Sequence, residues 1–352
     1  MAIEFIQQSG LLRHSGSLCV RNDYAHNDCT ECIDICPHDA LGIVKERFAI
    51  KTDACTACGA CLGGCPTQAL TLENFDPNSF VLQCSKSEPV TLSCKSNTVC
   101  LAAFDKQHLA TMALQSTAQI QCELSHCQTC SINTDFQISN IIKMRIEECN
   151  DFMTLLGIEK HIVSIETQPK QERFGVFKKA IQNIATLSHT QATEIYQKGA
   201  QKGLLKSMLL RNALRDQMRT ISSTLIDDKA HFFTQIGINF DTCTNCQECT
   251  LFCPTKALVP TDDKQGILFD GSQCVGCGIC DQVCKANAVS IESHYDIVDF
   301  IYERKNVLVH YEMALCQECK CAYPYKGGAQ ICDRCSAHVE DIAALFTLAR
   351  DM

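Results

Sequence analysis

Two runs of cysteines in the C-terminal half of the chain have the spacing of iron–sulfur ligands. In each run three cysteines are separated by two residues and a fourth follows after three more, at Cys243, Cys246, Cys249 and Cys253 and again at Cys274, Cys277, Cys280 and Cys284. Three such thiolates surround one iron–sulfur cube, and the fourth ligates the neighbouring cube. The spacing therefore predicts two [4Fe–4S] clusters, one on Cys243, Cys246, Cys249 and Cys284 and the other on Cys274, Cys277, Cys280 and Cys253. Zinc also binds cysteine pairs, but a zinc site has no use for a three-plus-one pattern repeated twice.

The same pattern recurs near the N-terminus, where residues 36–70 repeat the text of residues 253–289. An internal repeat of this length indicates a second copy of the whole module. We expect one complete cluster on Cys55, Cys58, Cys61 and Cys36. The other cluster of this copy has only three regular ligands, Cys29, Cys32 and Cys65.

Three alternatives are open for the ligand that this N-terminal cluster lacks. His26 occupies the regular spacing before Cys29 and could ligate through an imidazole nitrogen, as in some iron–sulfur sites. Cys19 could reach the site if the residues between it and Cys29 loop out, and thiolate is the softer ligand for iron–sulfur. The third alternative is a cluster of only three irons. We favour Cys19, and then expect His26 to hydrogen-bond a cluster sulfur and raise its potential.

Residues 236–292 resemble the two-cluster bacterial ferredoxins. The resemblance rests on the segments CPTKAL, GILFDGSQCVGCGIC and CKANAVSI, and it implies a pseudo-twofold fold of short hairpins and two small helices. Lys285 stands where that family usually has proline, which alters a turn but removes no ligand. The nine-residue spacing between Cys19 and Cys29 is also similar to a known ferredoxin variant.

Residues 79–168 have a different pattern. Short apolar runs at 79–85 and 89–96 and the segment 118–124 indicate strands, and helical spacing at 104–116 and 136–156 indicates an α/β unit with cysteines at strand ends. The segment is similar to the small iron–sulfur subunit that links certain hydrogenases and formate dehydrogenases to heterodisulfide reductase. That resemblance implies a [2Fe–2S] cluster on Cys84, Cys94, Cys122 and Cys127, with Cys130 in the same run. Structural zinc and free buried thiols are the alternatives, and Cys100 and Cys149 are expected in the core.

The last group of cysteines has the spacing of a zinc ribbon. Two CxxC pairs flank a turn-rich stretch, and their thiolates can converge on one tetrahedral ion: Cys316, Cys319, Cys332 and Cys335. A rubredoxin-like single iron is the alternative. Cys321 is surplus to this site.

Several elements must position these sites. The expected fold class is α+β: two ferredoxin-like dicluster modules at 1–78 and 233–296 flank a Cys-rich α/β domain at 79–168 and a basic helical connector at 169–232, and a zinc ribbon lies in 297–352. We expect the charged face of the connector to be solvated, with docking on an acidic partner as the alternative. A further helix is expected over residues 340–352.

Composition limits the function. The chain has 352 residues, 28 cysteines and a formal net charge of −9. The N-terminal residues do not have the apolar run of a signal peptide, and no stretch is apolar for long enough to span a membrane. The sequence therefore predicts a cytoplasmic protein with reduced, metal-bound thiols. The charge argues against nucleic acid as a partner and leaves only indirect membrane contact.

The predicted function is electron transfer. Four [4Fe–4S] clusters predict a protein or subunit that relays single electrons between a dehydrogenase or hydrogenase and another redox partner. No catalytic constellation or nucleotide-binding loop is evident. The alternative is a redox- or oxygen-responsive regulatory or assembly protein, because an irregular cluster is labile.

Overall fold

The computed structural model describes residues 12–24, 27–45, 47–84, 90–166, 205–219, 221, 224–228 and 232–337. The chain divides into two units, and each is treated by itself. The first comprises Met1–Gln235, Gly271–Cys277 and Glu292–Arg304, and the second comprises Ile236–Asp270, Gly278–Ile291 and Lys305–Met352.

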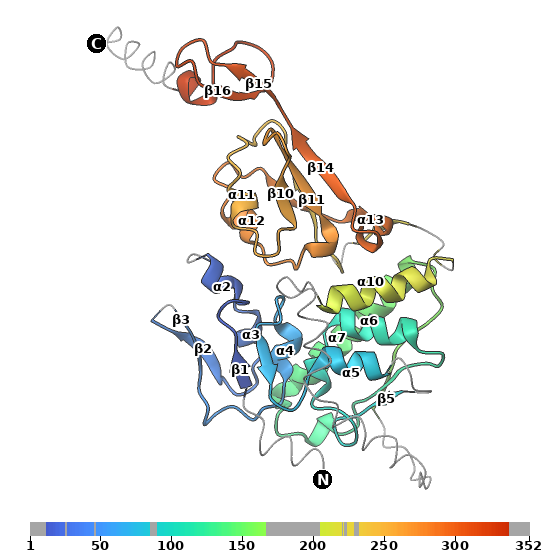
Figure 1. Cartoon of the computed structure of the whole chain (residues 1–352). Coiled ribbons are helices and arrows are strands. Elements are labelled where there is room, and N and C mark those ends of the chain that lie inside the picture. Colours follow the sequence, from blue (N-terminus) through green and yellow to red (C-terminus); the bar gives the residue numbers. More distant parts are fainter. Residues whose placement is uncertain are drawn as a thin grey trace, which may run out of the picture. The chain divides into compact units, whose positions relative to one another are not determined.

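The described residues of the N-terminal part of the first unit form two short antiparallel pairs and three small helices (Figure 1). Strand β1 (Leu12–His14) pairs with β4 (Leu70–Leu72), and β2 (Leu41–Val44) pairs with β3 (Arg47–Ile50). The helices are α2 (Val20–Asp23), α3 (Glu31–Asp34) and α4 (Ala60–Gly64). Two hairpin-like pairs with two small helices are what the repeated module predicts, and α2 is an addition to it.

A parallel sheet follows, in the segment 79–168 whose pattern predicts an α/β unit. Its strands are β5 (Thr91–Leu92), β6 (Gln121–Glu123) and β7 (Val163–Ile165), in that order. Helix α6 (Lys106–Gln115) lies between β5 and β6 in the sequence, and α7 (Gln137–Leu155) lies between β6 and β7. The sheet therefore brings the loops after β5 and β6 to one edge, because parallel strands end on the same side.

The strand expected at residues 79–85 is wrong, because this segment forms helix α5 (Pro77–Cys84). Asp76 caps it: the Asp76 carboxylate accepts from the Ser79 backbone N–H at 3.1 Å and from the Ser79 hydroxyl at 2.7 Å. A capping aspartate followed by proline in the first turn is a typical helix start. Cys84 consequently ends a helix and not a strand.

Helix α10 (Leu205–Gln217) is the described helix of the expected basic connector, and two of its basic residues, Lys206 and Arg211, are buried and not solvated, whereas Arg215 is exposed. The helix packs against α6 in the core of the first unit (Figure 1). Lys206 is buried in an ion pair with Asp105, and the Arg211 guanidinium lies 2.7 Å from the Glu303 carboxylate. The other helix expected in the connector, at 170–184, and the one expected at 340–352 lie outside the described residues.

The second unit contains an antiparallel sheet of β10 (Leu258–Pro260), β11 (Gly266–Asp270) and β14 (Lys305–His310). Helices α11 (Glu248–Leu251) and α12 (Ile279–Gln282) carry cysteines of the second repeat. Strand β14 joins this sheet although the sequence grouped it with the C-terminal region. The hairpin of β15 (Glu312–Leu315) and β16 (Ala322–Tyr325) follows.

Gly63 lies where α4 meets the segment after Cys100, and it has no room for a side chain. A Cβ at this position would lie 2.3 Å from the Ala102 carbonyl oxygen and 2.5 Å from Arg145 Nη1. That nitrogen is fixed, because it donates to the carbonyls of Ala102 and Phe104 at 2.7 Å each.

We therefore expect Gly63→Ala to destabilise the first unit by about 1–3 kcal/mol, the usual cost of overpacking. Gly42→Ala is the matched control, because a Cβ there meets nothing within 4 Å. Thermal unfolding of the two variants, purified without oxygen, measures the difference. Equal midpoints for the two would show that the contact at Gly63 relaxes at no cost.

Candidate cluster and metal sites

The structure brings the thiols of Cys19, Cys29, Cys32 and Cys65 together. Burial, followed by the negative charges of Cys65, Cys29 and Cys19, raises the pKa of Cys32 to about 12. Burial, followed by the charges of Cys65, Glu31 and Cys19, also raises the pKa of Cys29. Cys19 therefore lies with the three regular cysteines of the irregular cluster, at the position where a fourth ligand is missing.

The residues between Cys19 and Cys29 explain how this is achieved. The first four of them form the single turn of α2, which begins directly after Cys19. The Arg21 guanidinium donates to the Cys29 carbonyl at 3.2 Å, and the buried Asn27 side chain accepts from the Cys29 backbone N–H at 3.0 Å. His26 lies outside the described residues.

The second N-terminal set converges as well. Cys36, Cys55, Cys58 and Cys61 line one pocket together with Leu12, Leu41 and other apolar residues. Burial, followed by the charges of Cys58, Cys32, Cys36 and Cys55, raises the pKa of Cys61. Because Cys32 acts on Cys61, the two N-terminal sets lie close to each other.

A repeated backbone turn follows the last cysteine of each run. The third residue after that cysteine has a positive φ in all four runs: 47° at Asp39, 54° at Gln68, 59° at Lys256 and 48° at Asn287. The next backbone N–H then points at the thiol, from Ala40 to Cys36 at 3.3 Å, from Ala69 to Cys65 at 3.2 Å and from Ala288 to Cys284 at 3.2 Å. The left-handed conformation is costly for residues other than glycine, so its recurrence indicates a functional constraint.

In the second unit, Cys249 lies among Cys243, Cys246, Cys280 and Cys284. Burial, followed by the charges of Cys280, Cys243, Cys246 and Cys284, raises the pKa of Cys249 to about 12. Cys284 thus lies with the first run of this repeat, as expected if the fourth cysteine of each run binds the cluster of the other run. Cys274 and Cys277 fall in the first unit, so the set of these two with Cys280 and Cys253 stays a prediction from the sequence.

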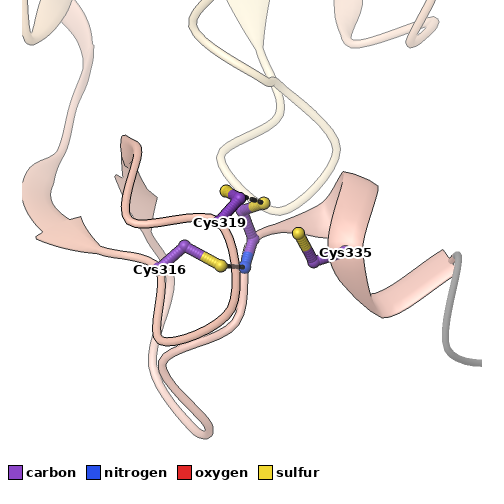
Figure 2. A group of neighbouring side chains, drawn as sticks. Cys316, Cys319 and Cys335 are labelled. Carbon is purple, nitrogen blue, oxygen red and sulfur yellow. Dashed lines mark hydrogen bonds between the residues drawn. The ribbon is translucent and has the colours of Figure 1, made fainter.

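The ribbon thiols form the tightest group (Figure 2). The sulfur atoms of Cys316, Cys319, Cys332 and Cys335 all lie within 4.8 Å of one another. The Cys319 and Cys332 sulfurs are 3.8 Å apart, and ligands at 2.3 Å from a tetrahedral zinc ion are also about 3.8 Å apart. A single tetrahedral ion therefore fits the group without rearrangement.

Backbone N–H groups lower the pKa of two of these thiols, which favours the thiolate form that binds metal. The Cys332 N–H donates to the Cys316 sulfur at 3.3 Å, and this bond lowers the pKa of Cys316. A backbone N–H from Cys321 is the main cause that lowers the pKa of Cys319 to about 6. The Cys321 thiol itself is exposed and outside the group, in line with its being surplus.

We expect Cys316→Ser to lose the bound ion of the ribbon and Cys321→Ser to retain it. Cys316 is fully buried inside the group, whereas Cys321 only lends its backbone. Zinc and iron per chain, measured by mass spectrometry of digested protein, decide the matter. Loss of the ion from Cys321→Ser alone would mean that the four sulfurs have been assigned wrongly.

The cysteines of residues 79–168 separate into two kinds. Cys84 at the end of α5 and Cys122 in β6 are buried, and burial raises the pKa of each to about 12. Neither lines the pocket where Cys94, Cys127 and Cys130 meet. Cys100, expected in the core, lies in that pocket instead. In the sequence, the only feature that places Cys100 with Cys94 is their separation of six residues.

No helix within the described parts of the chain is both long and apolar enough to cross a bilayer.

Comparison with known proteins finds related sites in two regions. The 4Fe-4S dicluster domain family matches residues 242–289, and the 4Fe-4S binding domain family matches residues 48–71. Ferredoxin 7Fe of Hydrogenibacillus schlegelii is 35% identical over 49 residues, which are 14% of this chain and 63% of that protein. The ferredoxin of Methanothermococcus thermolithotrophicus is 36% identical over 47 residues, 13% of this chain and 78% of that ferredoxin.

A third relative is the pyruvate synthase subunit PorD of Methanothermobacter marburgensis, 38% identical over 52 residues, which are 15% of this chain and 58% of that subunit. The chain thus spans less than two thirds of Ferredoxin 7Fe and of PorD.

Proposed function

Because this chain belongs to the 4Fe-4S ferredoxin family, we propose that it relays single electrons through four [4Fe–4S] clusters between a dehydrogenase or hydrogenase and another redox protein of the cytoplasm. The chain's role in iron–sulfur electron transfer follows from the family. The number of clusters, their ligands and the partners are the proposal.

One observation carries it: the thiols of Cys19, Cys29, Cys32 and Cys65 meet as one set beside the set of Cys36, Cys55, Cys58 and Cys61. Each set includes one thiol from the other run of the repeat, Cys65 in the first and Cys36 in the second, and this crossing-over of ligands is typical of two-cluster modules. Donor sets made only of thiols suit iron–sulfur clusters. When bound, such a cluster accepts and releases single electrons.

The residues of the protein hold the clusters and adjust their reduction potentials. The N–H groups of Ala40, Ala69 and Ala288 donate to thiols that we assign as ligands, and donors to cluster sulfurs favour the more negative, reduced form. The same turn follows the last cysteine of all four runs, so the sets do not differ in this feature. We infer that the Cys19 set, with α2 in place of the regular loop, differs most in potential.

The partners follow from charge and from one relative. The chain's net charge of −9 becomes more negative with every bound cluster, since a [4Fe–4S] cluster with four thiolates contributes about −2. Such a protein docks best on basic surfaces of its redox partners. PorD is by name a subunit of pyruvate synthase, and we infer a comparable place for this chain within or beside an oxidoreductase.

The test is a count of iron, zinc and sulfide per chain on protein purified without oxygen, followed by a redox titration. We expect at least about sixteen irons, four for each cluster, and reversible reduction of all clusters. Zinc at about one per chain assigns the ribbon, and an extra iron in its place assigns a rubredoxin-like site. A count of only a few irons contradicts the relay. Irreversible loss of one cluster with a change in shape would point to a sensor instead.

A further inference from the structure

A fifth group of thiols converges in the first unit, apart from the sets described above. Cys94, Cys100, Cys127 and Cys130 all line one pocket, whose wall also includes Ala57 and Cys58. None of the four thiols is exposed and none is fully buried. This partial exposure fits metal ligands in a site at the edge of the core.

The parallel sheet explains why these four residues meet. Strand β5 pairs with β6 in parallel, with Thr91 opposite Gln121 and Leu92 opposite Cys122. The loops that leave the two strands therefore start from the same edge of the sheet, where parallel sheets commonly bind ligands. One loop carries Cys94 and Cys100, and the other carries Cys127 and Cys130.

Both loops are held by an asparagine. The Asn97 side chain donates to the Thr91 carbonyl at 2.7 Å and accepts from the Ser93 N–H at 2.9 Å. In the second loop, the Asn133 side chain donates to the Cys127 carbonyl at 2.9 Å and accepts from the Ser139 N–H at 2.9 Å. The cysteines thus sit on preorganised turns, as metal ligands require.

The pKa shifts of the pocket thiols show that these cysteines are close neighbours. Burial, followed by the charges of Cys94 and Cys130, raises the pKa of Cys127 to about 11. Burial, followed by the charges of Cys58, Cys94 and Cys127, raises the pKa of Cys100 to about 12. Lys95 and Lys143 act in the opposite direction on Cys94 and Cys127, respectively. The thiols are thus close enough to act on one another, and the two lysines act against that mutual effect.

The spread of the thiols argues against a single ion. Two ligands of one zinc ion lie at most about 4.6 Å apart, twice the zinc–sulfur distance. In the part of the chain that the structure describes, only the ribbon thiols satisfy a mutual limit of 4.8 Å. The two N-terminal sets also exceed that limit. The thiols of this pocket thus resemble the cluster sets and not the ribbon.

We propose that Cys94, Cys100, Cys127 and Cys130 bind a fifth iron–sulfur cluster at the edge of the parallel sheet. Cys100 and Cys130 take the places that the sequence assigned to Cys84 and Cys122.

The site lies next to the cluster set of Cys36, Cys55, Cys58 and Cys61. Ala57 and Cys58 belong to the walls of both pockets. The backbone between them is tight: a Cβ on Gly59, whose φ is +81°, would lie 3.3 Å from Val99 Cγ2 and 3.3 Å from Ala103 Cβ. A role of the fifth cluster in electron transfer rests on the function proposed above. The binding of a cluster by these four cysteines does not.

The first test uses the wild-type protein. Iodoacetamide is applied to protein purified without oxygen, before and after the iron is removed by a chelator, and the modified cysteines are identified by mass spectrometry. We expect Cys94 and Cys130 to be protected before removal and modified after it. Exposed Cys321 should react in both samples, and buried Cys122 reports unfolding. Rapid modification of Cys94 and Cys130 in the iron-loaded protein overturns the proposal.

The second test is the iron content of variants. Cys94→Ser combined with Cys130→Ser should lower it by about four atoms per chain for a [4Fe–4S] cluster or about two for a [2Fe–2S] cluster, and Cys84→Ser combined with Cys122→Ser should leave it unchanged. An unchanged count in the first pair overturns the proposal. Cys61→Ser separates the two hypotheses: if it lowers the iron content while the Cys94 and Cys130 pair does not, the four-cluster relay stands and only the fifth site fails.

Discussion

Cys19→Ser is expected to lower the iron content by about four atoms per chain, the content of one cubane. The reason is the arrangement of thiols at the irregular site, where Cys19 faces Cys29, Cys32 and Cys65. A hydroxyl is a much poorer ligand for iron–sulfur than a thiolate. Iron and sulfide per chain, with the electron paramagnetic resonance spectrum of the reduced protein, measure the loss.

His26→Ala is the matched variant, because His26 occupies the regular ligand spacing before Cys29. We expect it to retain the full count and to shift at most the potential of the cluster. The reverse pattern, in which His26→Ala loses iron and Cys19→Ser does not, would assign the imidazole as the ligand. If the count is unchanged in both variants and the wild type lacks one iron at this site, the cluster has only three irons.

The second large effect concerns stability. Lys206→Met is expected to destabilise the first unit by about 3–5 kcal/mol, because it leaves the buried carboxylate of Asp105 without its cation. Burial alone would raise the pKa of Asp105, but Lys206 and His108 hold it well below its usual range. The same carboxylate caps α6 by accepting from the His108 backbone N–H at 2.9 Å. The midpoint of thermal unfolding should fall by on the order of 10 °C.

Arg13→Met is the control for this variant. Arg13 and Glu73 form an exposed pair at 3.4 Å, and exposed pairs contribute about 0–1 kcal/mol. Adding Asp105→Asn to Lys206→Met removes the unpaired charge and should recover part of the loss. A Lys206→Met midpoint within a degree or two of that of Arg13→Met would show that water or another cation reaches Asp105.

The cysteines themselves were the strongest source of prediction. Spacing alone separates the two N-terminal sets from the ribbon, and Cys19 as the fourth ligand stays a prediction, which the nearness of its thiol to Cys32 supports. Strands β5 and β6 and helices α6 and α7 follow from local periodicity. These features depend on residues close together in the sequence or on ligand chemistry that restricts spacing.

Other features depend on contacts that no local pattern contains. The run at 79–84 is too short for its period to separate strand from helix, and the cap at Asp76 decides it. Lys206 is buried because of Asp105, which lies 101 positions away. Cys100 joins the fifth pocket because two strands pair in parallel, and the sequence does not state that pairing.

The unequal acidity of the thiols has a consequence for metal binding. The pKa of Cys319 is lowered to about 6, so the ribbon presents a thiolate at neutral pH before any metal arrives. Cys32 and Cys249, with pKa values raised to about 12, release their protons only as iron enters. The pKa of Cys335 in the same ribbon is also raised to about 12, so metal binding releases protons from the ribbon as well as from the buried sets, and we expect the affinity of every site to fall as the pH is lowered.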